Sequence, residues 1–138
     1  MSAYQKIIYL GGLYAGGVKG LKDTFKLLPE DTDAKIVIAT VGLADPTDQA
    51  NIDNIRENLK KQMPQRIYGK ANIFHLRGGI DYSRLTLKHK TMMALLYQMT
   101  KKTPVEQQTA EQKGIIETYN REVDFVDLNS LDAIIGVI

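Results

Sequence analysis

Two stretches of the sequence contain residue types suited to holding a flat ligand. The first, GGLYAGGVKG, directly follows an apolar run, and its glycines allow the backbone to approach a ligand or adopt positive φ. Tyr14 within it offers an aromatic face for stacking. The second, VGLADPTD, joins a glycine to a carboxylate after another apolar run. If both runs are parallel strands, the two loops lie at the carboxyl edge of one sheet, where such folds bind ligands.

A purely structural interpretation of these loops stays open. Glycines after a strand often serve only as turn residues, and Tyr14 can be a packed aromatic. Neither loop matches a nucleotide motif, because Gly17 is followed by Val18 and Lys19 instead of the Lys-Ser/Thr pair of a P-loop, and the glycine spacing differs from a dinucleotide fingerprint.

Other polar residues give weaker indications of chemistry. His75 and His89 are expected to be hydrogen-bonded structural residues, and Asp81 is expected to form an ion pair in its loop with a neighbouring arginine. The sequence shows neither a metal-ligand constellation nor a nucleophile with its base.

Composition restricts the class of protein. The 138 residues suit one domain, and the net charge of +2, with scattered basic residues, argues against a nucleic-acid partner. No apolar run reaches the ~20 residues of a membrane-spanning helix. Cysteine is absent and the first residues lack a signal-peptide pattern, so we expect a cytoplasmic protein.

Periodicity predicts an α/β fold. The runs Lys6–Leu10, Ile36–Val41 and Asn72–Leu76 are apolar on both faces, which is typical of strands in a parallel sheet between helix layers. Helical spacing predicts crossover helices over Val18–Leu28 and from Asp45, as cap, to Pro64. The order strand, helix, strand, helix, strand favours right-handed crossovers.

The second half of the chain is predicted to be mainly helical. A helix is expected over Leu85–Lys102, with Leu85, His89, Met92, Met93, Leu96 and Met99 on one face. We interpret this Met-rich face as core or interface, with membrane-surface contact as the alternative because lysines flank it. Further helices are expected from Thr109 through Tyr119, and after Ser130 with Leu131, Ile134, Ile135 and Ile138 inward.

Three stretches carry a family resemblance that covers nearly the whole chain. IIYLGGLYAGGVKGL, VIATVGLADP and FHLRGGIDYSRLTLKHKTMM resemble flavodoxin-domain proteins related to menaquinone-dependent protoporphyrinogen dehydrogenase. The third stretch is the most specific, because ordinary short-chain flavodoxins lack a GG-x-DYSRL loop leading into a Met-rich helix. The resemblance implies a flavodoxin-like three-layer α/β/α fold with a parallel sheet, in which the three predicted strands correspond to the third, fourth and fifth of the family.

The resemblance also implies a cofactor and its site. Family members bind FMN at the carboxyl edge of the sheet, and the two loops of this sequence correspond to those that face the isoalloxazine ring. The implied contacts are Gly11, Gly12, Tyr14, Ala15, Gly16, Gly42, Leu43, Ala44 and Asp45. The first two family strands and the phosphate-binding loop have no counterpart here, so we expect an N-terminally incomplete domain over residues 1–138 with impaired FMN binding.

Two functional hypotheses follow. The first is an FMN-dependent electron-transfer or oxidoreductase domain, with a redox protein or a quinone as partner. The second is a non-catalytic, truncated domain that acts as a homodimer or as half of a split flavodoxin-like protein. Both hypotheses leave the edge of strand 6–10 unpaired, and we expect a second copy to cover it.

Overall fold

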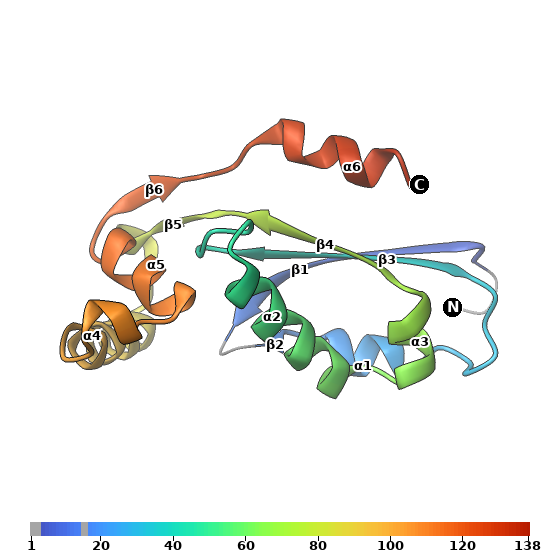
Figure 1. The fold of residues 1–138 in the computed structure, drawn as a ribbon, viewed down its shortest axis with the longest axis horizontal. Coiled ribbons are helices and arrows are strands. Elements are labelled where there is room, and N and C mark those ends of the chain that lie inside the picture. The colour runs from blue at the N-terminus through green and yellow to red at the C-terminus, as the bar shows by residue number, and fades with distance from the viewer. Residues whose placement is uncertain (1–3, 15–16) are drawn as a thin grey trace.

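The computed structural model describes residues 4–14 and 17–138 and contains a four-stranded sheet in the order β2-β1-β3-β4 (Figure 1). Strands β1 (Lys6–Tyr14) and β4 (Asn72–Arg77) run parallel to the central β3 (Lys35–Gly42) on its two sides. The two-residue β2 (Gly17–Val18) pairs antiparallel with the end of β1. The predicted parallel α/β architecture is therefore confirmed.

One face of the sheet carries the main hydrophobic core. It is covered by α1 (Leu21–Phe25), α2 (Gln49–Gln62) and α3 (Gln65–Lys70), which lie together below the strands in Figure 1. These elements and the sheet bury mainly branched aliphatic side chains, since Ile36 and Ile38 of β3 and one face of α2 point to the same layer. We call β1 to β4 with α1 to α3 the sheet body.

The opposite face of the sheet is covered less completely. The short helices η3 (Leu128–Leu131) and α6 (Asp132–Ile135) lie over it, and Ile134 is buried against Val37 and Ala39. The prediction for this last segment is only partly correct. Ser130 lies inside η3 and does not cap a helix, and Ile135 and Ile138 are exposed, because α6 is a single turn that presents one side chain to the sheet.

The remaining elements form a second packed group at one end of the sheet. Here β5 (Gly79–Asp81) pairs antiparallel with β6 (Glu122–Asp124), and α4 (Leu87–Lys101) packs on α5 (Ala110–Thr118). The 3-10 turns η1 (Tyr82–Arg84) and η2 (Val105–Gln107) connect them. The stretch RGGIDYSRL, expected to be a loop, thus contributes a strand. We call β5, β6, α4 and α5 the lateral unit.

Capping residues set the helix boundaries of the lateral unit. The Thr86 hydroxyl accepts a hydrogen bond from the backbone N–H of His89 and begins α4. Thr109 and Gln112 form a reciprocal capping box that begins α5, so the predicted start at Thr109 is confirmed.

The first glycine-rich stretch differs most from its prediction. The strand expected to end at Leu10 continues to Tyr14, and Val18, expected in a helix, lies in β2. Helix α1 begins only at Leu21 because the preceding Gly20 adopts a left-handed φ of 79°, which interrupts helical geometry. The glycines that follow Leu10 therefore belong to the second half of a long strand and to its pairing with β2, and they do not form a loop directly after Leu10.

Candidate functional site

The carboxyl ends of β1 and β3 lie side by side, as the parallel prediction requires. Gly12 in β1 is in register with Val41 in β3, and Gly42 is in register with Arg77 in β4. The two predicted loops are thereby brought to the same edge of the sheet. Ala15 and Gly16, two of the expected contacts, lie outside the described residues.

Gly11 and Gly12 lie within β1 and not in a loop. A Cβ on Gly11 would stand 2.3 Å from a methyl of Val18, so glycine is needed there for packing of the hairpin on the core. At Gly12 a Cβ would meet no atom within 4 Å among the described residues. Gly12 therefore leaves open space beside the backbone, whereas Gly11 has a structural role.

Tyr14 ends β1 with half of its surface exposed. Its ring meets the imidazole of His89 edge-on, with centroids 6.2 Å apart, and its hydroxyl lies 4.0 Å from the sulfur of Met92. Both neighbours belong to α4. Tyr14 thus connects the hairpin to the lateral unit while part of its ring stays accessible. It is partly packed, as the structural interpretation expects, and partly free for stacking on a ligand.

The β3 loop is held closely from two sides. Gly42 leaves room for Leu13, whose methyl would lie 2.8 Å from a Cβ at this position. The carbonyl oxygen of Leu43 accepts a hydrogen bond from Arg77 Nε at 2.9 Å, and the backbone of Ala44 packs against Gly114 of α5. The loop backbone is therefore fixed at the sheet edge.

Asp45 is occupied by its own turn. Its Oδ1 accepts hydrogen bonds from the Thr47 hydroxyl at 2.7 Å and the Thr47 backbone N–H at 2.9 Å. The Thr47 hydroxyl is the main cause that lowers the pKa of Asp45 below its usual value. The predicted cap of α2 is wrong: Asp48 is the N-cap and accepts from the backbone N–H of Asn51, because the turn at Asp45 delays the helix by three residues.

Sequence reasoning missed the part played by Arg77. Besides binding the Leu43 carbonyl, its guanidinium pairs with the Glu117 carboxylate at 3.0 Å and lies 3.7 Å from the centre of the Phe125 ring. It joins the β3 loop, α5 and the segment after β6. Asp81 forms its ion pair with Arg84, as expected of this loop. The local sequence around Arg77 does not predict its partners, which are 34 to 48 residues away in the chain.

His75 is hydrogen-bonded on both ring nitrogens. Arg56 donates to its Nε2 at 3.3 Å, which leaves the proton on Nδ1, facing the Thr40 hydroxyl at 2.8 Å. Burial, and then the charge of Arg56, lower the pKa of His75. The expected structural role of this histidine is confirmed. Within the part of the chain that the structure describes, no group of His, Asp or Glu is arranged to hold a metal ion.

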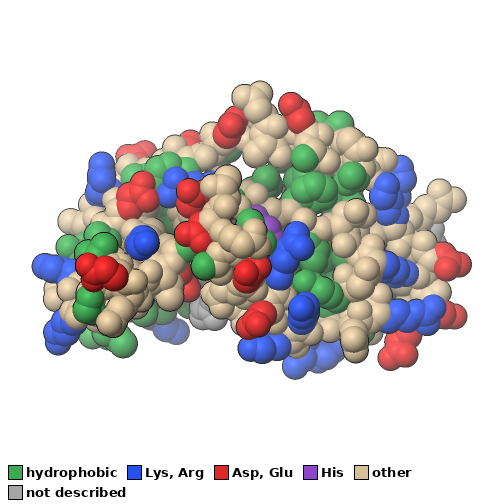
Figure 2. Space-filling view, viewed as in Figure 1, with side chains coloured by type: hydrophobic (Ala, Val, Ile, Leu, Met, Phe, Trp, Pro, Cys, Tyr) green, Lys and Arg blue, Asp and Glu red, His purple; other side chains and the backbone are tan. Residues whose placement is uncertain are grey.

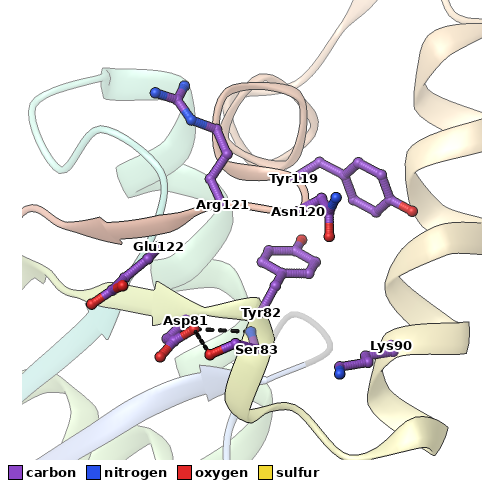
Figure 3. Close-up of a pocket in the computed structure, with 8 residues that line it drawn as sticks. All are labelled: Asp81, Tyr82, Ser83, Lys90, Tyr119, Asn120, Arg121 and Glu122. Carbon is purple, nitrogen blue, oxygen red and sulfur yellow. Dashed lines mark hydrogen bonds between the residues drawn. The ribbon is translucent and has the colours of Figure 1, made fainter.

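A cavity of about 330 Å³ lies in the lateral unit, away from both predicted loops (Figure 3). Figure 3 shows Tyr82, Tyr119 and Asn120 gathered between the β5–β6 pair and α4, with Lys90 projecting from α4. Tyr82 Oη is buried and makes no hydrogen bond within the described structure, and the neighbouring Thr118 hydroxyl donates to the Gly114 carbonyl. Burial, and then the neighbouring Tyr119, raise the pKa of Tyr82.

The parallel sheet, its crossover helices and the two loops that meet at its carboxyl edge define a flavodoxin-like α/β protein. The model of a flavodoxin domain family matches residues 1–107 of the chain. The chain therefore belongs to the flavodoxin-domain family, whose members typically bind FMN for electron transfer. No curated protein and no solved structure gave a significant match. Within the described residues, no helix has the length and hydrophobicity needed to cross a membrane.

The described residues fit one part of FMN and not the other. The open space at Gly12, the half-exposed Tyr14 and the fixed backbone of Leu43 and Ala44 suit the edge and face of a planar ring. A phosphate would be expected at a helix N-terminus. The N-terminus of α2, which follows the β3 loop, is instead capped by the Asp48 carboxylate, a group that repels a second anion.

Proposed function

We propose that the chain binds the isoalloxazine ring of FMN at the carboxyl edge of β1 and β3 and serves in electron transfer. The observation that supports this most directly is the convergence of open backbone at Gly12 with the fixed loop at Leu43 and Ala44. Among the expected contacts, Gly12, Tyr14, Gly42, Leu43 and Ala44 line this edge, Gly11 supports it from the core, and Asp45 holds the turn that follows.

When bound, the flavin supplies one- or two-electron redox chemistry, and the protein supplies its position and electrostatics. Tyr14 offers the accessible part of its ring for contact with a planar face. The backbone of Leu43 and Ala44 offers hydrogen-bonding groups at a fixed position, since Arg77 and Gly114 hold that backbone. A fixed loop needs little ordering on binding, which favours affinity.

We further propose that the affinity resides in the ring and not in the phosphate. Charge-assisted hydrogen bonds to a phosphate contribute roughly 1.5–3 kcal/mol each, and the Asp48 carboxylate at the start of α2 offers none. FMN and riboflavin should then bind the chain with similar, modest affinity. A flavodoxin with a complete phosphate site would strongly prefer FMN.

Paired titrations test both parts of this proposal. Flavin fluorescence is followed while protein is added to FMN and, separately, to riboflavin. Gly12→Leu fills the open space beside β1 and should weaken both flavins about tenfold or more, because several contacts of the ring are lost. Gly69→Leu is the matched control, since Gly69 in α3 is also exposed with open space at its Cβ. Unchanged fluorescence at high micromolar protein would rule out flavin binding by this chain.

The chemistry of the electron donor and acceptor is a finer proposal. The GG-x-DYSRL stretch at Gly78–Leu85 supports assignment to the branch related to menaquinone-dependent protoporphyrinogen dehydrogenase. We propose a porphyrinogen as electron donor and a quinone as acceptor. Anaerobic mixing of flavin-loaded protein with protoporphyrinogen, followed by the rise of porphyrin fluorescence with and without a quinone, tests it. A rise that is no faster than in free FMN would contradict this assignment.

A second candidate function is a non-catalytic domain that associates through β1. On the side away from β3, the described part of β1 is paired only at Leu13 and Tyr14, by β2. Ile8 and Leu10 on this strand are exposed, and unpaired apolar edges are templates for another strand. We propose that a second copy pairs with this edge.

Light scattering tests this association. Ile8→Lys places a charge beside the unpaired edge and should convert a dimer to a monomer, whereas Leu27→Lys, at an exposed position after α1, should not. A wild-type monomer at high concentration would exclude the second copy.

A further inference from the structure

The outer side of α4 is a continuous apolar surface on the described molecule. Met92, Leu95, Leu96 and Met99 follow the spacing i, i+3, i+4, i+7, so they form one stripe along the helix. Leu95 is 63% exposed and Met99 67%, unusually high for large apolar residues at adjacent positions. We call these four residues the α4 outer face.

This exposure does not come from a loosely held helix. The opposite side of α4 packs on the rest of the lateral unit: Thr100 is buried, and the Tyr97 ring stacks on Tyr119 with centroids 3.9 Å apart and planes 6° apart. The Thr86 cap fixes the helix start. The α4 outer face is therefore preformed, and three of its four side chains, Leu95, Leu96 and Met99, remain exposed, while Met92 at its edge also contacts Tyr14.

The charged residues of α4 itself are all basic, although the neighbouring α5 carries Glu111 and Glu117. Between Tyr82 and Val105 the sequence contains no Asp or Glu, and every charged residue there is basic. The lysines of α4 and its end form no ion pair with a described residue, although Lys101 lies over the Tyr97 ring. These basic residues are Arg84, Lys88, Lys90, Lys101 and Lys102.

Its position makes this surface accessible to a flat partner. Figure 1 shows α4 at the extreme end of the molecule, beyond α5 and away from the sheet. Figure 2 shows hydrophobic side chains intermingled with basic and some acidic side chains at that end. A protruding amphipathic helix with apolar and lysine side chains suits the interface of an anionic lipid bilayer, where the apolar groups enter the acyl boundary and lysines reach the headgroups.

From this charge complementarity we propose that the α4 outer face docks the protein on anionic membrane surfaces. A two-fold copy is the less favoured occupant, because it would bring Lys88 and Lys102 of both protomers together across an apolar seam. Contact with the acidic segment Glu122–Asp132 of another copy is the other outcome, which the experiment separates from lipid binding. The proposal does not depend on flavin binding.

Flotation with vesicles tests the proposal on the full chain. Vesicles of phosphatidylcholine alone are compared with vesicles containing one quarter phosphatidylglycerol, at low and high salt. The bound fraction should rise about tenfold or more with the anionic lipid and fall with salt, since each lysine near the surface contributes to attraction that salt screens. Equal binding to both vesicle types, or none at millimolar lipid, would overturn the proposal.

Variants locate the contact. Leu95→Gln with Met99→Gln should reduce partitioning at least fivefold, while Leu27→Gln, exposed on the sheet body, should not change it. Lys88→Gln with Lys102→Gln should abolish the preference for anionic lipid, and Lys22→Gln with Lys61→Gln serves as the charge-matched control. Circular dichroism confirms that each variant is folded. If the Leu95/Met99 variant instead binds vesicles normally, or abolishes a lipid-independent dimer seen by light scattering, the surface belongs to a protein contact and the lipid proposal is wrong.

Discussion

Different kinds of contact stabilise the sheet body and the lateral unit. In the sheet body, Leu21, Phe25, Ile36, Ile38 and Leu59 are almost entirely removed from solvent. In the lateral unit, tyrosine rings stack, caps fix the helix starts, and large apolar side chains remain outside. The difference indicates that the sheet body supplies most of the hydrophobic stability, while the lateral unit offers surface for contacts beyond the chain.

Among the variants proposed here, one that removes an aromatic ring from the core of the sheet body should lower the free energy of unfolding most. Phe25 is 1% exposed and its ring packs against Tyr9. Phe25→Ala should lower the free energy of unfolding by about 3–5 kcal/mol, because transfer and cavity terms add. Urea denaturation measures it, with Leu27→Ala as the exposed neighbouring control. A loss below about 1 kcal/mol would show that the sheet body is not the dominant core.

Cutting the junction between the two regions should have an intermediate effect. Arg77→Met removes the hydrogen bond to Leu43, the ion pair with Glu117 and the charge over Phe125. We expect the free energy of unfolding to fall by about 1.5–3 kcal/mol. The ion pair contributes the smaller part of this loss, because Glu117 is half exposed and water screens the pair. Arg66→Met, on the exposed side of α3, is the control in the same urea experiment. Equal midpoints for the two variants would mean that the regions are joined by other contacts.

Acid should act on the sheet body through His75. Its pKa in the folded state is below its ordinary value of 6.5, so the unfolded chain binds the proton more readily. Stability from the neutral imidazole is therefore complete above the unfolded pKa and is lost as pH falls through the folded pKa. Urea midpoints between pH 7.5 and 5 should decrease, and His75→Gln should flatten that decrease. His89→Gln is the control in α4, and an identical slope in His75→Gln and wild type would contradict this cause.

The smallest change in the free energy of unfolding is expected for a substitution inside the lateral unit. Because Tyr82 Oη is buried without a hydrogen-bond partner among the described residues, Tyr82→Phe should leave the unfolding free energy within about 0.5 kcal/mol or raise it slightly. Tyr82→Ala, which also removes the edge contact with Tyr119, should be clearly destabilising. Thermal unfolding compares the two variants. A loss above about 1 kcal/mol in Tyr82→Phe would reveal a partner for the hydroxyl.

The sheet body was predictable because its signals are local. Consecutive apolar residues in Ile36–Val41 and Asn72–Leu76 locate β3 and β4 to within one residue at each end, and Ile55 and Leu59 mark the buried side of α2. The convergence of the two candidate loops also followed, since parallel strands must end at one edge.

The remaining features depend on contacts that local patterns do not contain. The glycines after Leu10 looked like a turn, yet Gly11 is required by Val18 across the hairpin. The sequence left open whether the Met-rich face of α4 is core or interface, and only the position of the helix at the end of the molecule shows that Leu96 and Met99 stay outside. The partners of Arg77 become visible only once distant elements are placed together.

The central position of β3 has a consequence for dynamics. Its backbone is paired along both sides, and residues 36 to 40 are buried in succession. Their amide protons can reach water only when the whole sheet comes apart, so they should exchange with solvent deuterium last of all. These amides would thus report the global opening of the molecule, while those in the rest of the chain exchange through smaller local fluctuations.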